Sequence, residues 1–179
     1  AEAVTSYEAK LARADLPNMP FHSEPLMNGH KDYEFLNIEQ RKVMLVYFSS
    51  FVRKLPISYI TFVYRRSQFE DPARLMERMG RDISSAMIEH LGFFRSFDDV
   101  KVYYDNGQDI VKQALDRSVG KVLSKGVVRR RKTSMTDYRL EQVADYLCTI
   151  ELALVKYEAK ENGETYNKFF GGIGSFKRN

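Results

Sequence analysis

Two aspartates occupy positions from which a strand and a helix can present carboxylates to one metal ion. Asp105 follows the strand-like run 100–104, and Asp145 lies in a long helical pattern that begins near residue 136. Hard cations take oxygen ligands, and Mg²⁺ typically uses only one or two carboxylates beside the phosphates of a substrate. The pair therefore predicts a magnesium or manganese site that acts on a phosphate group.

Asp105 has two interpretations. In open α/β sheets, ligands bind outside the carboxyl ends of the strands, and Asp105 has that position after the run 100–104. Asp105, Asn106 and Gly107 are also ordinary turn residues, because Asp and Asn hydrogen-bond their own backbone and tolerate unusual dihedral angles. The sequence leaves both interpretations open.

Asp145 lies on the polar side of an amphipathic helix. Helical spacing places Leu140, Val143, Leu147, Ile150 and Leu154 on one stripe, and Tyr138, Gln142, Asp145 and Thr149 on the other. The simpler interpretation is a solvated face. Because Ala144 and Leu152 border the polar side, we also expect it to be partly covered, and a carboxylate there needs a basic side chain or a cation as its partner.

A second group of candidates is basic or lies in a loop. We expect the residues Arg129, Arg130, Arg131, Lys132 and Arg139 to contact nucleic-acid phosphates, although a charged edge strand protected against aggregation fits the same pattern. His22 and Glu24 lie in the proline-rich stretch 15–27, which we expect to be a loop. Glu24 is a candidate metal ligand and His22 a candidate general acid or base, and a surface loop without chemistry is the alternative.

The composition sets the class of protein. The chain has 179 residues, 44% of them hydrophobic, and a net charge of +4, which permits nucleic acid as a partner without requiring it. No stretch is apolar enough to predict a membrane span, and the single cysteine, Cys148, excludes an internal disulfide and a cysteine-rich zinc site. We therefore expect a cytoplasmic protein, and the sequence leaves its oligomeric state open.

Helical and strand-like patterns alternate along the chain. The patterns predict helices over 1–13, from the capping residue Asn37 to Leu55, over 108–123 and over 136–160. Another predicted helix covers 72–91, with Asp71 as its capping residue and Gly92 as its end, and strands are predicted over 57–64, 100–104 and 127–130. Such alternation is typical of an α/β domain with a central sheet. We expect one α/β domain over residues 1–162 and a loop-like tail over 163–179.

Four segments resemble a bacterial family known as domain of unknown function 3800. They are 20–23 (PFHS), 53–57 (RKLPI), 100–108 (VKVYYDNGQ) and 137–146 (DYRLEQVADY). The resemblance implies a ribonuclease H-like mixed sheet flanked by helices and metal-dependent nuclease activity. It assigns acids of the site to Asp105 and Asp145 and the histidine of a loop to His22. Family members begin with an aspartate-bearing strand, so the resemblance also implies that the N-terminal strands are absent from this chain.

The leading hypothesis is a metal-dependent nuclease. In it, Asp105, Asp145 and an acid outside this chain hold Mg²⁺ or Mn²⁺ while basic residues hold the nucleic-acid backbone. The alternative is a noncatalytic module that binds nucleic acid or another protein on the same scaffold.

Overall fold

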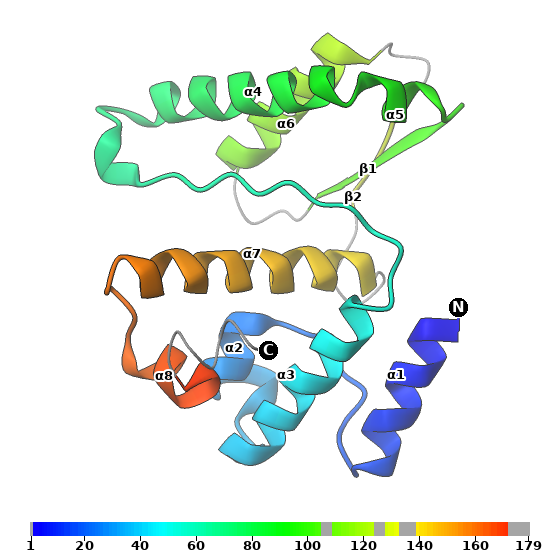
Figure 1. Cartoon of the computed structure of the whole chain (residues 1–179), viewed down its shortest axis with the longest axis vertical. Coiled ribbons are helices and arrows are strands. Elements are labelled where there is room, and N and C mark those ends of the chain that lie inside the picture. Colours follow the sequence, from blue (N-terminus) through cyan, green and yellow to red (C-terminus); the bar gives the residue numbers. More distant parts are fainter. Residues whose placement is uncertain (1, 105–108, 124–127, 133–138, 172–179) are drawn as a thin grey trace. The chain divides into compact units, whose positions relative to one another are not determined.

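The computed structural model describes residues 2–104, 109–123, 128–132 and 139–171. The chain divides into two compact units (Figure 1). Unit 1 combines residues 1–61 with 138–179, and unit 2 comprises residues 62–137. Unit 1 is therefore built from two segments that are far apart in the sequence.

Unit 1 is helical. Its elements are α1 (Glu2–Arg13), α2 (Ser23–Asn28), the 3₁₀ helix η1 (Lys31–Tyr33), α3 (Ile38–Val52), α7 (Arg139–Glu158) and α8 (Glu164–Phe170). Asn37 caps α3 as predicted, because its side chain accepts a hydrogen bond from the Gln40 amide at 3.0 Å. The Gln40 side chain accepts one from the Asn37 amide in return, which completes a capping box.

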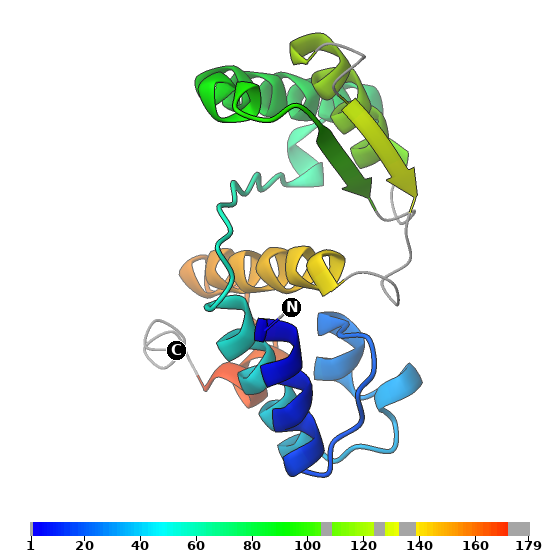
Figure 2. The ribbon, with the colours of Figure 1, turned by 90° about the vertical axis from the view of Figure 1, so that its right-hand side faces the viewer.

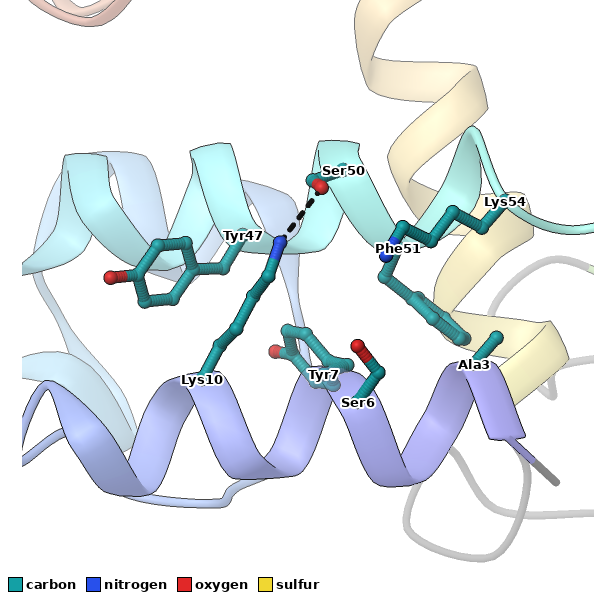
Figure 3. A pocket seen from close by; sticks show the side chains of 8 residues that line it. All are labelled: Ala3, Ser6, Tyr7, Lys10, Tyr47, Ser50, Phe51 and Lys54. Carbon is teal, nitrogen blue, oxygen red and sulfur yellow. Dashed lines mark hydrogen bonds between the residues drawn. The ribbon is translucent and has the colours of Figure 1, made fainter.

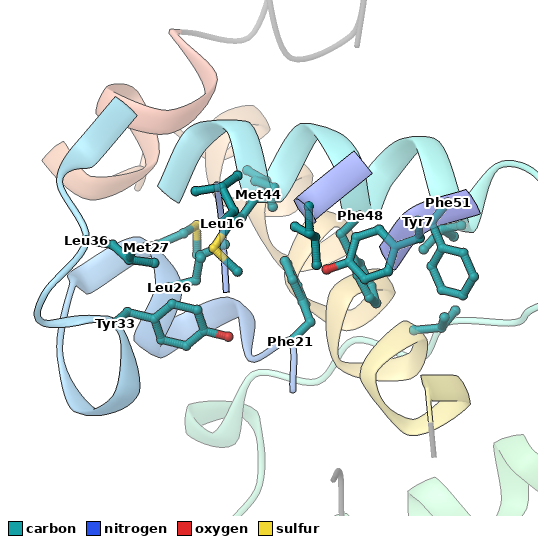
Figure 4. Close-up of a cluster of buried hydrophobic side chains, with 14 of the residues drawn as sticks. Tyr7, Leu16, Phe21, Leu26, Met27, Tyr33, Leu36, Met44, Phe48 and Phe51 are labelled. Carbon is teal, nitrogen blue, oxygen red and sulfur yellow. The ribbon is translucent and has the colours of Figure 1, made fainter. Parts of the chain in front are cut away.

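Aromatic rings form the centre of the core of unit 1. Phe21 and Phe48 stack with their ring centres 3.9 Å apart, and Tyr7 meets the edge of Phe48 at 5.5 Å (Figure 4). Phe51 lies against both Tyr7 and Phe48, and Val143 of α7 belongs to the same buried cluster. The core thus joins α1, the segment before α2, α3 and α7.

Unit 2 pairs two helices with a small sheet. Its elements are η2 (Arg66–Gln68), α4 (Pro72–Glu89), α5 (Leu91–Arg95), β1 (Val100–Tyr104), α6 (Asp109–Val122) and β2 (Val128–Lys132). Asp71 caps α4 as predicted, with its side chain accepting from the Arg74 amide at 2.8 Å. Helices α4 and α6 approach closely where the Ser118 hydroxyl of α6 donates to the Gly80 carbonyl of α4 at 2.8 Å.

Strands β1 and β2 are parallel (Figure 2). They pair in a register that runs from Val100 opposite Val128 to Tyr104 opposite Lys132, and α6 forms the crossover between them. Val100 and Val102 pack against a small buried cluster that includes Met87 of α4. The predicted strands at 100–104 and 127–130 therefore form a βαβ unit, with the second strand shifted by one to two residues.

The predicted ribonuclease H-like fold is wrong. The described residues are mostly helical and form only a two-stranded sheet, whereas that fold needs a mixed sheet of several strands. Residues 57–64, predicted as a strand, are not in a strand, and within the described part of the chain they pair with neither β1 nor β2. Its β-branched and aromatic residues favour extended backbone, but this preference cannot supply a partner.

Three local predictions are also wrong. The tail expected to be a loop contains α8, whose Phe170 is buried in the core of unit 1. The proline-rich loop contains α2, since Pro25 lies in its first turn, where a missing N–H costs nothing. Gly92 does not end a helix but lies within α5.

Replacing Gly80 by alanine should stabilise unit 2. A Cβ atom at this helical position would lie 3.8 Å from Ser118 Oγ, which is ordinary contact, and alanine is the better helix former. We expect the free energy of unfolding in urea to rise by about 0.5–1 kcal/mol. Gly29→Ala is the control. Gly29 has a φ of +69° and its Cβ would lie 2.7 Å from the Arg41 guanidinium, so that variant should lose stability. Equal effects of the two changes would contradict the α4–α6 packing.

Candidate functional site

The side chain of Asp145 on α7 reaches the start of α2. Its Oδ2 atom accepts a hydrogen bond from the backbone amide of Ser23 at 2.7 Å. The residue in the capping position of α2, His22, makes no side-chain cap of its own. Asp145 therefore caps this helix from an element more than a hundred residues away, and its negative charge suits the N-terminal end.

Two further side chains fix the segment before α2. Gln142, one turn before Asp145, accepts from the Phe21 amide at 3.0 Å through its Oε1 atom and is 1% exposed. The hydroxyl of Tyr33 accepts from the His22 amide at 2.9 Å and donates to the Pro20 carbonyl at 2.7 Å. The amides of residues 21, 22 and 23 thus each donate to a side chain, which holds this segment in one conformation.

Arg139 begins the same polar stripe of α7. Its Nη1 atom donates to the Met19 carbonyl at 3.2 Å and to Gln142 Oε1 at 3.0 Å. Its Nη2 atom contacts the side chains of Glu8, at 3.2 Å, and Asn18. Because the guanidinium is turned inward and its side chain is only 19% exposed, little of it is left for a phosphate. The structure gives Arg139, predicted as a nucleic-acid contact, a structural role.

The structure brings the segment that carries His22 and Glu24 into contact with Asp145. Ser23, whose amide binds Asp145, stands between the other two in the sequence. Glu24 is exposed and accepts hydrogen bonds from Asn28 at 2.7 Å and from His30 at 3.1 Å. The hydrogen bond with His30 is the main cause that lowers the pKa of Glu24. The loop candidates and the helix candidate of the sequence analysis therefore belong to one region of unit 1.

The other predicted site residues are not placed. Asp105 lies outside the described residues, and so do the side chains of Arg129, Arg130, Arg131 and Lys132, whose backbone forms β2. Among the side chains that the structure describes, no group of three His, Cys, Asp or Glu residues lies close enough to hold a metal ion. Of the predicted metal ligands, Asp145 and Glu24 thus lie among the described residues.

Sequence analysis missed Gln142 and Tyr33 as residues of this region. A signal for Gln142 is present, because Arg139, Gln142 and Asp145 follow one another at three-residue steps on a helix that is otherwise rich in apolar residues. Such a stripe indicates polar contacts to a neighbouring segment as readily as exposure to solvent. Tyr33 has no comparable signal, since its role depends on the path of the backbone at residues 20–22.

Alkaline pH should unfold unit 1. Burial raises the pKa of Tyr33 from its usual 10.0 to about 12, and burial also raises the pKa of Tyr7. The unfolded chain therefore loses these protons first, so the free energy of unfolding should fall as the pH rises from about 10 to about 12. Urea unfolding at a series of pH values checks this. The variant Tyr33→Phe should show a shallower fall, and an unchanged fall would contradict the buried position of this phenol.

Replacing Arg139 should destabilise unit 1 without acting on ligand binding. Arg139→Met keeps the length of the side chain but leaves Glu8 and the Met19 carbonyl without their donor. We expect a loss of about 2–3 kcal/mol in the free energy of unfolding. Arg13→Met at the exposed end of α1 is the control and should cost little. Similar losses for both variants would contradict the role assigned to Arg139.

No family model, no curated protein and no solved structure matches the chain. The resemblance to the domain of unknown function 3800 family therefore stays a prediction from four short segments. None of the helices that the structure describes is long and apolar enough to cross a membrane.

Proposed function

We propose that the chain belongs to a metal-dependent nuclease that hydrolyses phosphodiester bonds in RNA or DNA. The observation that carries this proposal is the hydrogen bond between Asp145 Oδ2 and the Ser23 amide. It supports a common site because it joins the helix that carries one candidate acid to the segment that carries His22 and Glu24. Through this one contact, two segments that are distant in the sequence and that carry residues predicted to act together meet directly.

The surroundings of Asp145 suit an oxygen ligand of a hard cation. Only its Oδ2 atom accepts a hydrogen bond from another described residue, which leaves Oδ1 for a ligand. Beside it, the hydroxyl of Ser23 is buried and has no hydrogen-bond partner among the described residues. Buried hydroxyls are normally satisfied, so this atom supports the presence of a further polar group in the working site.

Asp145 would serve as one oxygen ligand of Mg²⁺ or Mn²⁺, and the second ligand expected from the sequence, Asp105, lies outside the described residues. The ion would stabilise negative charge on the phosphate oxygens and make bound water a nucleophile at neutral pH. The Ser23 amide keeps the Asp145 carboxylate in a fixed orientation, which ligands of a catalytic ion require. In this proposal His22, the residue before Ser23, would give or take the proton.

Strand β2 supports nucleic acid as the substrate. Four of its five residues, Arg129 to Lys132, are basic, and they follow one another on a strand whose backbone is fixed by β1. Contacts of lysine and arginine with phosphates supply most of the affinity that does not depend on sequence. The binding that we propose is therefore weakened by salt.

A noncatalytic module that binds nucleic acid or a protein is the second candidate. One observation favours it: Gln142 and Asp145 both serve as acceptors for backbone amides, which accounts for the polar side of α7 without any chemistry. A chain that binds nucleic acid equally in Mg²⁺ and in EDTA, and cleaves nothing, would support it.

The variant Asp145→Asn tests the nuclease. Asparagine keeps an oxygen for the Ser23 amide, so the fold should survive, but it removes the charge that binds the metal. We expect Mg²⁺-dependent cleavage of labelled single-stranded RNA or DNA to fall by about 100-fold or more.

Glu151→Gln is the matched control for this test. It removes the same charge from the same helix and keeps an acceptor for the Tyr59 hydroxyl, 3.2 Å away. Cleavage should be unchanged in this variant. Equal rates for the wild type and Asp145→Asn would reject the nuclease.

A further inference from the structure

Helices α1 and α3 enclose a shallow hollow on unit 1, distant in sequence from the residues of the proposed site. It is lined by Ala3, Ser6, Tyr7, Lys10, Tyr47, Ser50, Phe51 and Lys54 (Figure 3). The hollow is shallow and open to solvent, so a ligand would bind at the surface between the two helices. Its floor is apolar, because Tyr7 and Phe51 belong to the buried core. Its polar side chains are those of two lysines and two serines.

The two helices contribute similar pairs of residues. On α1, Ser6 is followed four residues later by Lys10, and Ser50 in the last turn of α3 is followed four residues later by Lys54. The helices are antiparallel, since Ala3 lies near Phe51 and Lys10 lies near Tyr47 (Figure 3). Each side of the hollow therefore offers one hydroxyl and one ammonium group.

Lys10 is held in place within this arrangement. Its Nζ atom donates to Ser50 Oγ at 3.0 Å and lies 5.7 Å from the centre of the Tyr47 ring. An ammonium group has three N–H donors, so this hydrogen bond leaves capacity for a ligand. A cation that is already ordered loses less conformational entropy on binding than a free lysine does.

The charge of the hollow is positive. None of its eight lining residues is acidic, and among the described residues neither Lys10 nor Lys54 forms an ion pair. Because α1 begins where α3 ends, the dipoles of the two helices oppose each other there. The lysines therefore decide which ligands are attracted, and they select an anion.

We propose that this hollow binds one phosphate group of a nucleic-acid backbone. Lys10 and Lys54 supply the charge, and the hydroxyls of Ser6 and Ser50 donate hydrogen bonds to the phosphate oxygens. Lysine and serine are common contacts of backbone phosphates, which carry no sequence information. The choice of nucleic acid over free phosphate rests on the proposed function, because a nuclease must hold its substrate beyond the bond that it cleaves.

The double variant Lys10→Gln/Lys54→Gln tests this site in the full chain. Binding of a fluorescent single-stranded oligonucleotide, measured by anisotropy in EDTA, should weaken about 10-fold, and the slope of log affinity against log salt should fall by about one, as expected for the loss of one phosphate contact. The control Lys42→Gln/Lys168→Gln removes two lysines of unit 1 that pair with Glu39 and Glu164. It should change both quantities much less.

Lys54→Glu guards against an effect of folding. Lys54 is exposed, and its side chain forms no hydrogen bond or ion pair with another described residue, so this variant should keep the wild-type unfolding temperature and still bind more weakly. Equal losses in the control variant, or wild-type affinity in both hollow variants, would overturn the proposal. The assignment to nucleic acid would be overturned if inorganic phosphate bound at the hollow while the affinity for the oligonucleotide did not depend on Lys10 and Lys54.

The readout separates this inference from the nuclease proposal. If the chain binds nucleic acid through Lys10 and Lys54 but does not cleave it, the phosphate site stands and the nuclease proposal is rejected. If the chain cleaves nucleic acid but its affinity does not change when both lysines are replaced, the nuclease proposal stands and the phosphate site is rejected.

Discussion

Unit 1 depends on satisfying three backbone amides that no regular secondary structure can pair. The amides of residues 21–23 donate to Gln142, Tyr33 and Asp145, and Arg139 holds both Gln142 and the Met19 carbonyl. A buried amide without an acceptor costs about 1–3 kcal/mol, so this set of contacts decides the path of the segment. The same contacts place Phe21 against Phe48 in the core.

Structure and proposed chemistry therefore share the same side chain. Asp145 caps α2 with one oxygen and retains the other, so a role in folding does not exclude a role in metal binding. Gln142 and Arg139 differ from it, because their polar atoms are directed to the protein interior. A polar helix face can thus combine residues that stabilise the fold with one that serves a ligand.

The sequence predicts what short-range chemistry determines. Asn37 and Asp71 cap helices as expected, because a cap needs only a backbone amide three residues away. The strand over 57–64 and the ribonuclease H-like fold fail, because pairing depends on strands elsewhere that composition cannot supply. The contact of Asp145 with Ser23 also depends on distant residues, and only the three-residue spacing of polar residues on α7 signals it.

The division of unit 1 into two segments has a consequence for how the protein forms during synthesis. Residues 1–61 leave the ribosome first, yet the acceptors for Phe21 and Ser23 arrive only with α7, after all of unit 2 has been made. Unit 2 contains its own packed helix pair and βαβ crossover, so it can become ordered before α7 is available to pack against α1, α2 and α3. During that interval the aromatic side chains of residues 1–61 are not covered by α7. In this nascent state chaperones and proteases have access to the chain.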